Sequence, residues 1–445
     1  MNEDPAGQST DRPSDWRRWL DSHVNRELGV GVAPTGRQEQ PSRSAIDALL
    51  DALGSPQRDF RAVVVAGTNG KTTVTHTVSA LIEASGSRVG RYTSPHLERV
   101  NERIAVDGAP ITDAALGDLI GRIAISEPVL DEPLSWFEII TAAAFTWFAQ
   151  QHVDVAIIEV GLGGEWDATA AAAPELVAVT NIDLDHTEYF GATRHAIADA
   201  EAGIISPGTT VVLGETDHTL RPCFSRRNPR QLWVRDRDFA VLGRHQTTDA
   251  QILSLKTPST TYHKLRTPLR GAAHAENVSL ALTVAECAIG RLHEPTIRGV
   301  LASQRSPGRM ELLDTQPLVL LDGAHNPAGM SALAAVLAES FPAGSRTFIL
   351  GVSRDKPVAE LIRALELRDE DRVLCCTAHH PRAVSAESLA DVVRATAPNT
   401  SAVHVASDVR DALRRARAAN PAPALIVVAG SLYLVGDARH VLKHT

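Results

Sequence analysis

The segment RAVVVAGTNGKTT, residues 61–73, decides the expected fold. Its apolar half, residues 61–66, predicts a short buried strand, and a helical pattern follows from residue 72 to about residue 84. Glycines in the turn between them allow backbone N–H groups to wrap phosphate oxygens, Lys71 can reach the terminal phosphates, and Thr72 offers a hydroxyl to Mg²⁺. Val65 departs from the usual GxxxxGK(S/T) spacing, and a turn without function is the alternative. We predict a nucleoside triphosphate site formed by Gly67, Thr68, Asn69, Gly70, Lys71, Thr72 and Thr73.

Strand and helix patterns alternate along the rest of the chain, which indicates an α/β fold with a mostly parallel sheet. Residues 135–151 predict a long apolar helix, and Asp107-Gly108 predicts a hairpin turn. Further buried strands are predicted at 153–160, 176–182, 318–321, 347–352, 372–377 and 424–428. The pattern restarts near residue 297. We therefore expect a disordered tail at 1–15, a nucleotide-binding domain at 16–296 and a second α/β domain at 297–445.

The composition excludes several classes of partner. The formal net charge is -9 and the basic residues are scattered, so a nucleic-acid surface is not expected. The four cysteines have no CxxC spacing, which argues against a disulfide framework and against a zinc site. No apolar run reaches the ~18 residues of a membrane helix, and the N-terminus lacks the pattern of a secretory signal. We expect a soluble, cytoplasmic protein without nucleic-acid or membrane partners.

Polar side chains end two predicted strands of the first domain. Glu159 ends an apolar run and is followed by glycines, and ligands bind at the carboxyl ends of strands in open α/β sheets. A buried carboxylate is costly unless it is paired or binds a metal, so Glu159 is a candidate Mg²⁺ ligand, with a structural ion pair as the alternative. His186 follows the next strand at the equivalent end. A single histidine is more often structural, so its candidacy depends on Glu159 and the glycine loop.

The second domain offers a similar set. Asp322 and His325 come directly after the apolar run 318–321, where they could meet a ligand held between the two domains. Arg309 precedes that strand, and its guanidinium suits phosphate neutralisation. An ordinary turn is the alternative for each of these segments.

Together these motifs resemble folylpolyglutamate synthase/dihydrofolate synthase, a branch of the Mur-ligase superfamily. The similar segments appear in family order and span about residues 50–440. They include AGTNGKTT (66–73), GRYTSPHLERVNERIAVDG (90–108), EVGLGG (159–164), NIDLDHTEYFG (181–191), SPGRME (306–311), LDGAHNP (321–327), GVSRDK (351–356) and GSLYLVG (430–436). The set is more specific than any one of its motifs.

The resemblance implies an N-terminal P-loop ATPase domain and a smaller, Rossmann-like C-terminal domain, with the active site between them. The implied reaction joins L-glutamate to a pterin-type carboxylate, dihydropteroate or a tetrahydrofolyl-glutamate, with ATP and two Mg²⁺ ions. The acceptor carboxylate would attack the γ-phosphate to form an acyl phosphate, and the glutamate amine would then displace phosphate. A monomer is the family default.

The resemblance also implies residue roles. Metal binding is implied for Thr72, Glu159 and His186. Nucleotide binding is implied for the P-loop residues and for Asn277, Arg309 and Asp322. Substrate binding is implied for Thr93, Ser94, Pro95, His96, His325 and Ser431. The residues that we expect to matter most for catalysis are Lys71, Glu159, His186, Glu201 and His325.

Glu201 is a departure from the family pattern. The family segment EKAGII carries a lysine that is carbamylated and acts as an anion at the second metal. This chain reads AEAGII at residues 200–205, so Glu201 takes the place of the lysine. A glutamate supplies the same charge on a shorter stem. Our hypothesis is that Glu201 replaces the carbamate and reaches the metal directly or through water. The alternative is that the second metal site is altered or lost.

Other departures bear on the acceptor. Glu165 stands where the family has arginine, Ala170 where it has asparagine, and His274 where its adenine-side segment has glutamine. They are compatible with a distant folate enzyme, and also with a related ligase for a non-folate carboxylate. A non-catalytic nucleotide-binding protein is a third hypothesis, against which the complete set of motif residues argues.

Overall fold

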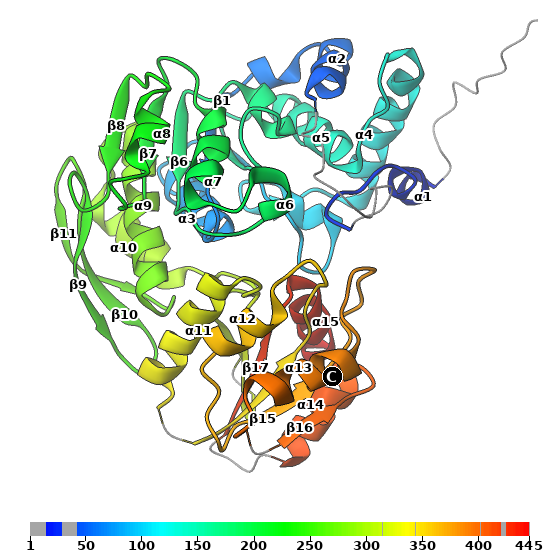
Figure 1. Cartoon of the computed structure of the whole chain (residues 1–445). Coiled ribbons are helices and arrows are strands. Elements are labelled where there is room, and N and C mark those ends of the chain that lie inside the picture. Colours follow the sequence, from blue (N-terminus) through cyan, green and yellow to red (C-terminus); the bar gives the residue numbers. More distant parts are fainter. Residues whose placement is uncertain are drawn as a thin grey trace, which may run out of the picture.

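The computed structural model describes residues 15–28, 42–313, 315–342, 344–400, 402–419 and 424–444. The tail expected at 1–15 lies outside these ranges except for Asp15, which caps the first helix. Two units follow one another along the chain, each built on its own large sheet. In Figure 1 the N-terminal unit, blue to green, lies above the C-terminal unit, yellow to red.

The larger sheet has eight strands in the order β4-β3-β2-β5-β1-β6-β7-β8. The strands are β1 (Arg61–Ala66), β2 (Val89–Tyr92), β3 (Ile104–Val106), β4 (Ala109–Pro110), β5 (Val155–Glu159), β6 (Leu176–Val179), β7 (Thr210–Leu213) and β8 (Gln231–Val234). Neighbouring strands pair in parallel except at β3, which is antiparallel to both β2 and β4 and forms with β4 the hairpin predicted at Asp107-Gly108. The glycine loop directly follows β1, so it lies at the carboxyl edge of the sheet, where ligands bind. Because β1 lies between β5 and β6, this position is in the middle of that edge.

Helices cover both faces of this sheet, which explains why its central strands are apolar throughout. In β1, Ala62 and Val64 belong to one core, whereas Val63 and Val65 belong to the other. The first core includes α1 (Trp16–Asp21), α2 (Ser44–Ala52), α4 (Asp113–Ser126), α5 (Trp136–Gln150), α6 (Thr187–Phe190), α7 (Arg194–Glu201) and α8 (Arg221–Ser225). The second includes α3 (Lys71–Glu83), α9 (Ala272–Ile289) and α10 (Glu294–Ser303).

A small antiparallel sheet, which was not expected from the sequence, extends the N-terminal unit. Its three strands are β9 (Ala240–Gln246), β10 (Gln251–Lys256) and β11 (Thr261–Thr267). Helix α10 packs on β11 and α3, so its residues lie with the N-terminal unit. The domain boundary near residue 297 stays a prediction, and this packing favours a position after α10.

The C-terminal unit has a six-stranded sheet in the order β12-β13-β17-β14-β15-β16, parallel except for β12. The strands are β12 (Glu311–Leu313), β13 (Leu318–Leu321), β14 (Ser345–Leu350), β15 (Arg372–Cys375), β16 (Ala402–Val405) and β17 (Ala424–Ala429). One face packs on α11 (Pro327–Ser340), α12 (Val358–Ala364) and α13 (Ala386–Thr396), and the other on α14 (Val409–Ala419) and α15 (Leu432–Lys443).

The expected fold class is confirmed: a larger, mostly parallel α/β unit is followed by a separate α/β unit. The four cysteines are all free thiols. Among the described helices, none combines the length and the apolar character that a membrane crossing requires.

Candidate active site

The P-loop has the backbone that a phosphate cradle requires. Gly67 and Gly70 both have positive φ, 113° and 87°. A Cβ on Gly67 would lie 2.3 Å from Thr180 Oγ1, and one on Gly70 would lie 2.6 Å from Asn277 Oδ1, so no larger residue fits either position. Helix α3 begins at Lys71, and its N-terminal N–H groups therefore face the loop.

Two side chains of the P-loop helix point toward the expected reaction centre. Lys71 Nζ donates to the carbonyl oxygens of Gly67 at 2.7 Å and Thr68 at 3.2 Å. Thr72 Oγ1 donates to Glu159 Oε1 at 2.8 Å, which brings the hydroxyl and the strand-end carboxylate together. The two residues that the resemblance implies as ligands of one Mg²⁺ ion are thus in direct contact.

Glu159 is a buried carboxylate with too little compensating charge. It is 2% exposed, and its second oxygen accepts from the Ser94 N–H at 3.3 Å. Burial raises the pKa of Glu159 to about 7, against the opposing effects of Lys71, Thr72 and Arg309. A divalent cation would supply the missing positive charge at this carboxylate.

Glu201 lies on the other side of the P-loop. It ends α7, is buried, and its Oε2 accepts from the Gly67 N–H at 3.1 Å. Burial raises the pKa of this carboxyl, although Lys71 and the Gly67 N–H oppose the shift. Glu201 and Gly67 line a small pocket behind the loop, which they share with Lys71 and His186.

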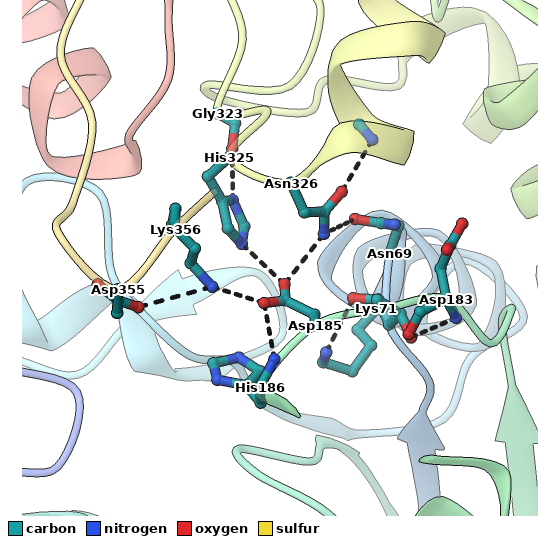
Figure 2. Close-up of polar contacts among 12 residues, drawn as sticks. Asn69, Lys71, Asp183, Asp185, His186, Gly323, His325, Asn326, Asp355 and Lys356 are labelled. Carbon is teal, nitrogen blue, oxygen red and sulfur yellow. Dashed lines mark hydrogen bonds and ion pairs between the residues drawn. The ribbon is translucent and has the colours of Figure 1, made fainter. Parts of the chain in front are cut away.

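The carboxylate of Asp185, a residue not selected from the sequence, contacts three side chains of the C-terminal unit (Figure 2). Lys356 Nζ lies 2.6 Å from Oδ1, while Asn326 Nδ2 and His325 Nε2 lie 3.0 and 3.5 Å from Oδ2. Burial would raise the pKa of Asp185, but His325, His186 and Lys356 hold it well below its usual range. We call Asp185, His325, Asn326 and Lys356 the Asp185 cluster.

His186 follows Asp185 and adopts a left-handed backbone, with φ of 49°. Burial lowers the pKa of His186 to about 4. The positive charges of Lys356 and Lys71 also lower it, whereas the negative charge of Asp185 opposes the shift. The imidazole is therefore neutral near neutral pH, which is the form that binds metals.

Asp322 and Arg309 face the cavity from the C-terminal unit. The two Asp322 oxygens accept from the N–H groups of Met310 at 2.8 Å and Ala324 at 2.9 Å. Burial lowers the pKa of Arg309, against Asp322 and Glu159. Burial likewise raises the pKa of Asp322, although Arg309 opposes the shift. Both charges are therefore held at a cost, as expected of groups that meet charged ligands.

One cavity of about 680 Å³ between the units unites most of the predicted residues. Those that line it are Thr68, Asn69, Gly70, Lys71, Thr72, Thr73, Ser94, Pro95, Glu159, His186, Asn277, Arg309, Asp322, His325 and Ser431. His96 instead lines a neighbouring cavity of about 430 Å³, where its Nδ1 accepts from Arg103 Nε at 2.9 Å. Thr93 is buried, and its N–H donates to the Arg103 carbonyl.

The donors present fit a hard cation better than a transition metal. Among the described residues, no cluster of three or more histidine, cysteine, aspartate or glutamate side chains is arranged to hold a metal. Mg²⁺ needs no such cluster, because it is held by one or two protein oxygens together with phosphate oxygens and water. Thr72 and Glu159 provide that kind of site.

Sequence reasoning missed Asp185, Asn326 and Lys356. All three follow strands of their sheets, in the segments after β6, β13 and β14. The rule that selected Glu159, a polar residue just beyond an apolar strand, applies to them as well. Lys356 was harder to select because a loop of several residues separates it from the end of β14.

Comparisons with known proteins agree with this geometry. The Mur ligase middle domain model matches residues 65–285, and the Mur ligase glutamate ligase domain model matches residues 308–432. The dihydrofolate synthase/folylpolyglutamate synthase of Mycobacterium tuberculosis is 37% identical over an alignment of 436 residues. This alignment covers 90% of this chain and 89% of that protein.

Solved structures give the same answer. Folylpolyglutamate synthase of Mycobacterium tuberculosis, complexed with ADP and AMPPCP, has a TM-score of 0.86 at 35% identity and covers 96% of this chain and 97% of that one. A bifunctional folylpolyglutamate synthase/dihydrofolate synthase with Mn, AMPPNP and L-glutamate bound has a TM-score of 0.82 at 29% identity, covering 97% and 98%. The chain belongs to the folylpolyglutamate synthase/dihydrofolate synthase family of Mur ligases.

Proposed function

We propose that this ligase joins L-glutamate to a folate-type carboxylate, dihydropteroate or a tetrahydrofolyl-glutamate, at the expense of ATP. The observation that carries the proposal is the cavity of about 680 Å³ between the units, which is lined by the P-loop, Glu159, Arg309 and His325. Relatives that match most of the chain carry folate-ligase names. One solved relative is complexed with ADP and AMPPCP, and another holds Mn, AMPPNP and L-glutamate.

The chemistry explains why two units close on one site. A carboxylate is a poor electrophile, so its oxygen first attacks the γ-phosphorus of ATP. The bond from that phosphorus to ADP breaks, ADP leaves, and an acyl phosphate is formed. The amine of glutamate then attacks the acyl carbon, phosphate departs, and the amine loses a proton as the amide forms. Water would hydrolyse the acyl phosphate, so the reaction needs an enclosed cavity. Lys71 and Arg309 stabilise the charge on the phosphoryl oxygens.

Thr72 and Glu159 would hold a Mg²⁺ ion, with His186 as a candidate for a second. The ion would screen the phosphate charges and fix the γ-phosphate for attack. The raised pKa of Glu159 and the neutral imidazole of His186 support these roles. The number of ions stays a prediction.

The remaining roles follow from position in the cavity. Asp322, with both oxygens fixed by backbone N–H groups, would bind the ribose. Asn277 of α9, which lies against Gly70 of the P-loop, would bind the nucleotide. His325 and Ser431 would place L-glutamate. Ser94 and Pro95 would contact the pterin, and His96 would act from the neighbouring cavity.

Glu201 would act as a fixed anion at the back of the P-loop. Its contact with the Gly67 N–H supports an effect on the loop backbone in addition to any effect on a second metal. A Glu201→Gln variant should lose turnover and show an altered Mg²⁺ dependence. Unchanged turnover and Mg²⁺ dependence would contradict this role.

The test of the function is ADP release with ATP, Mg²⁺ and L-glutamate, with and without dihydropteroate or tetrahydrofolate, followed by mass spectrometry of the pterin. A product heavier by one glutamyl unit is expected. Nucleotide binding without pterin-dependent turnover would instead favour a non-folate acceptor, and would direct attention to Glu165 and Ala170. A monomeric state and a cytoplasmic location stay predictions from the sequence.

A further inference from the structure

Asn326 begins helix α11, and its side-chain amide has an unambiguous orientation. Its Oδ1 accepts from the Gly329 N–H at 2.8 Å, which is the N-cap bond of the helix. The Nδ2 end must therefore face away, and it lies 3.0 Å from Asp185 Oδ2 (Figure 2). A carboxylate can only accept, so this partner also requires the nitrogen there. Asn326 is 2% exposed, so neither bond is a surface contact.

The same nitrogen reaches the P-loop. Asn326 Nδ2 lies 3.0 Å from Asn69 Oδ1, so one amide group of the C-terminal unit joins two loops of the N-terminal unit. These two loops are already bonded to each other, because the Asn69 N–H donates to Asn181 Oδ1 and the Asp183 N–H donates to Thr68 Oγ1, both at 2.9 Å. A shift of the P-loop on nucleotide binding would therefore be transmitted to Asn326.

His325, the residue expected to place glutamate, directly precedes this cap. Its Nδ1 lies 2.8 Å from the Gly323 carbonyl and its Nε2 faces Asp185, so its position depends on the loop that Asn326 holds. Figure 2 shows the two side chains converging on Asp185 from the same side. The cap, the P-loop and the amine-donor side of the cavity thus share one bonded path.

We propose that Asn326 is a positioning residue that couples nucleotide binding to glutamate binding, by holding the loop 322–326 in register with the P-loop. The proposal rests on the proposed function for the identity of the amino acid. Capping alone would give Asn326 no part in this coupling, so the two roles can be separated by substitution.

Asn326→Ser and Asn326→Asp separate them. Serine and aspartate are N-caps of similar quality to asparagine, so α11 should start normally in both variants. Serine is too short to bridge to Asp185 and Asn69, while aspartate has no donor and faces Asp185 with a like charge. If Asn326 acts only as a cap, both variants behave like the wild type. If it positions the loop, both lose function and aspartate loses more.

The primary measurement is calorimetric binding of AMPPNP with Mg²⁺, in the absence and presence of saturating L-glutamate, which requires no turnover. We expect L-glutamate to tighten AMPPNP binding at least about fivefold in the wild type, and both variants to lose this effect. Steady-state kinetics should show the KM for L-glutamate rising about tenfold in Asn326→Ser and about 100-fold in Asn326→Asp, with the KM for ATP changing less than about threefold.

Two further variants serve as controls. Ser385 is the N-cap of α13, and its Oγ accepts from the Ser388 N–H at 3.2 Å. Ser385→Ala removes this cap and so loosens the same unit, but it should leave the coupling intact. Asp185→Asn combined with Asn326→Asp exchanges donor and acceptor, and should bind L-glutamate better than Asn326→Asp alone.

The outcomes distinguish the inference from the function. Coupling in the wild type that both variants lose, without turnover of any pterin, would support the inference and reject the folate acceptor. Glutamylation of the pterin by the wild type, with coupling preserved in Asn326→Asp, would overturn the inference and leave the function standing. Absence of coupling in the wild type would overturn the inference whichever acceptor is used.

Discussion

Two of the regions in which the units meet have opposite electrostatic character. At the flank, defined by Leu97, Glu98, Glu311 and Arg439, every charge is matched: Arg439 Nε lies 2.9 Å from Glu311 Oε2, and Arg439 also pairs with Glu98. Although burial would raise the pKa of Glu98, Arg439 and Lys443 hold it below its ordinary value. At the centre, defined by Glu159 and Arg309, burial raises the pKa of Glu159 and lowers the pKa of Arg309. In both cases burial favours the neutral form.

The difference shows what each region is for. The flank is also packed: Leu97 joins an apolar core of the C-terminal unit, and a Cβ on Gly436 would lie 2.1 Å from the Leu97 carbonyl oxygen. Such contacts hold the units together whether or not a substrate is present. The centre keeps charges that the protein alone does not satisfy, which is how a site is prepared for phosphates, carboxylates and a cation. Stability and chemistry are thus assigned to different contacts.

Glu159→Gln tests the centre, with the largest expected effect. Turnover should fall about 10³-fold, because the cation and the phosphoryl group lose an anionic partner. The melting temperature should stay the same or rise, because a buried neutral amide costs less than an under-compensated carboxylate. Glu175→Gln, at a half-exposed surface pair with Arg61, is the control for loss of a glutamate. A strongly destabilised but active variant would reverse the assignment of the two regions.

Arg439→Ala tests the flank. The substitution leaves Glu98 and Glu311 without their shared cation, and both are only 15–17% exposed. We expect the free energy of unfolding to fall by about 2 kcal/mol, which is less than for a fully buried pair, while kcat changes less than about fivefold. Thermal and denaturant unfolding measure the free energy of unfolding, and ADP release measures kcat.

Arg417→Ala is the matched control, since this arginine is exposed on α14 and its loss should matter by less than about 0.5 kcal/mol. If Arg439→Ala abolished turnover in a stable protein, the flank would have a direct part in catalysis and the comparison would fail.

The centre should also leave a signature in the pH dependence of stability. In the folded chain the pKa of Glu159 is raised from 4.5 to about 7, so between these values the folded state holds a proton that the unfolded state has lost. The folded state therefore binds more protons, and this group makes stability fall as pH rises from about 4.5 to about 7, by at most about 3 kcal/mol. The measurement is the difference in unfolding free energy between the wild type and Glu159→Gln from about pH 5 to about pH 8. Parallel curves would contradict a raised pKa.

Local sequence patterns carried much of the fold and part of the site. The P-loop and the strand-end carboxylate of Glu159 were predictable, because strand, turn and helix succeed one another within a few residues there. The small sheet β9–β11 was not, because β9 leaves most of its side chains exposed and so lacks a clear apolar alternation.

Contacts between distant loops were beyond the sequence for a different reason. Asp183 and Asp185 flank one leucine and have the same chemistry, yet only Asp185 receives Lys356, which is 171 positions away. That choice depends on how the two units pack, which no local pattern encodes. His96 shows the converse: its motif was found, but Arg103 and the turn of the loop place it in the neighbouring cavity.

His274→Gln should have the smallest effect and sharpens the outer limit of the centre. His274 lines the cavity beside Asn277, and its Nδ1 lies 2.8 Å from the Arg270 carbonyl, a contact that an amide nitrogen can replace. Burial lowers the pKa of His274, so the substitution exchanges one neutral side chain for another. We expect the KM for ATP to change less than about threefold, with exposed His263→Gln as the control. A rise of about 30-fold or more in the KM for ATP would mean that the under-compensated region extends from the phosphates to the nucleobase. Only a side chain whose polar partner is the ligand itself would be so sensitive to the exchange of one neutral group for another.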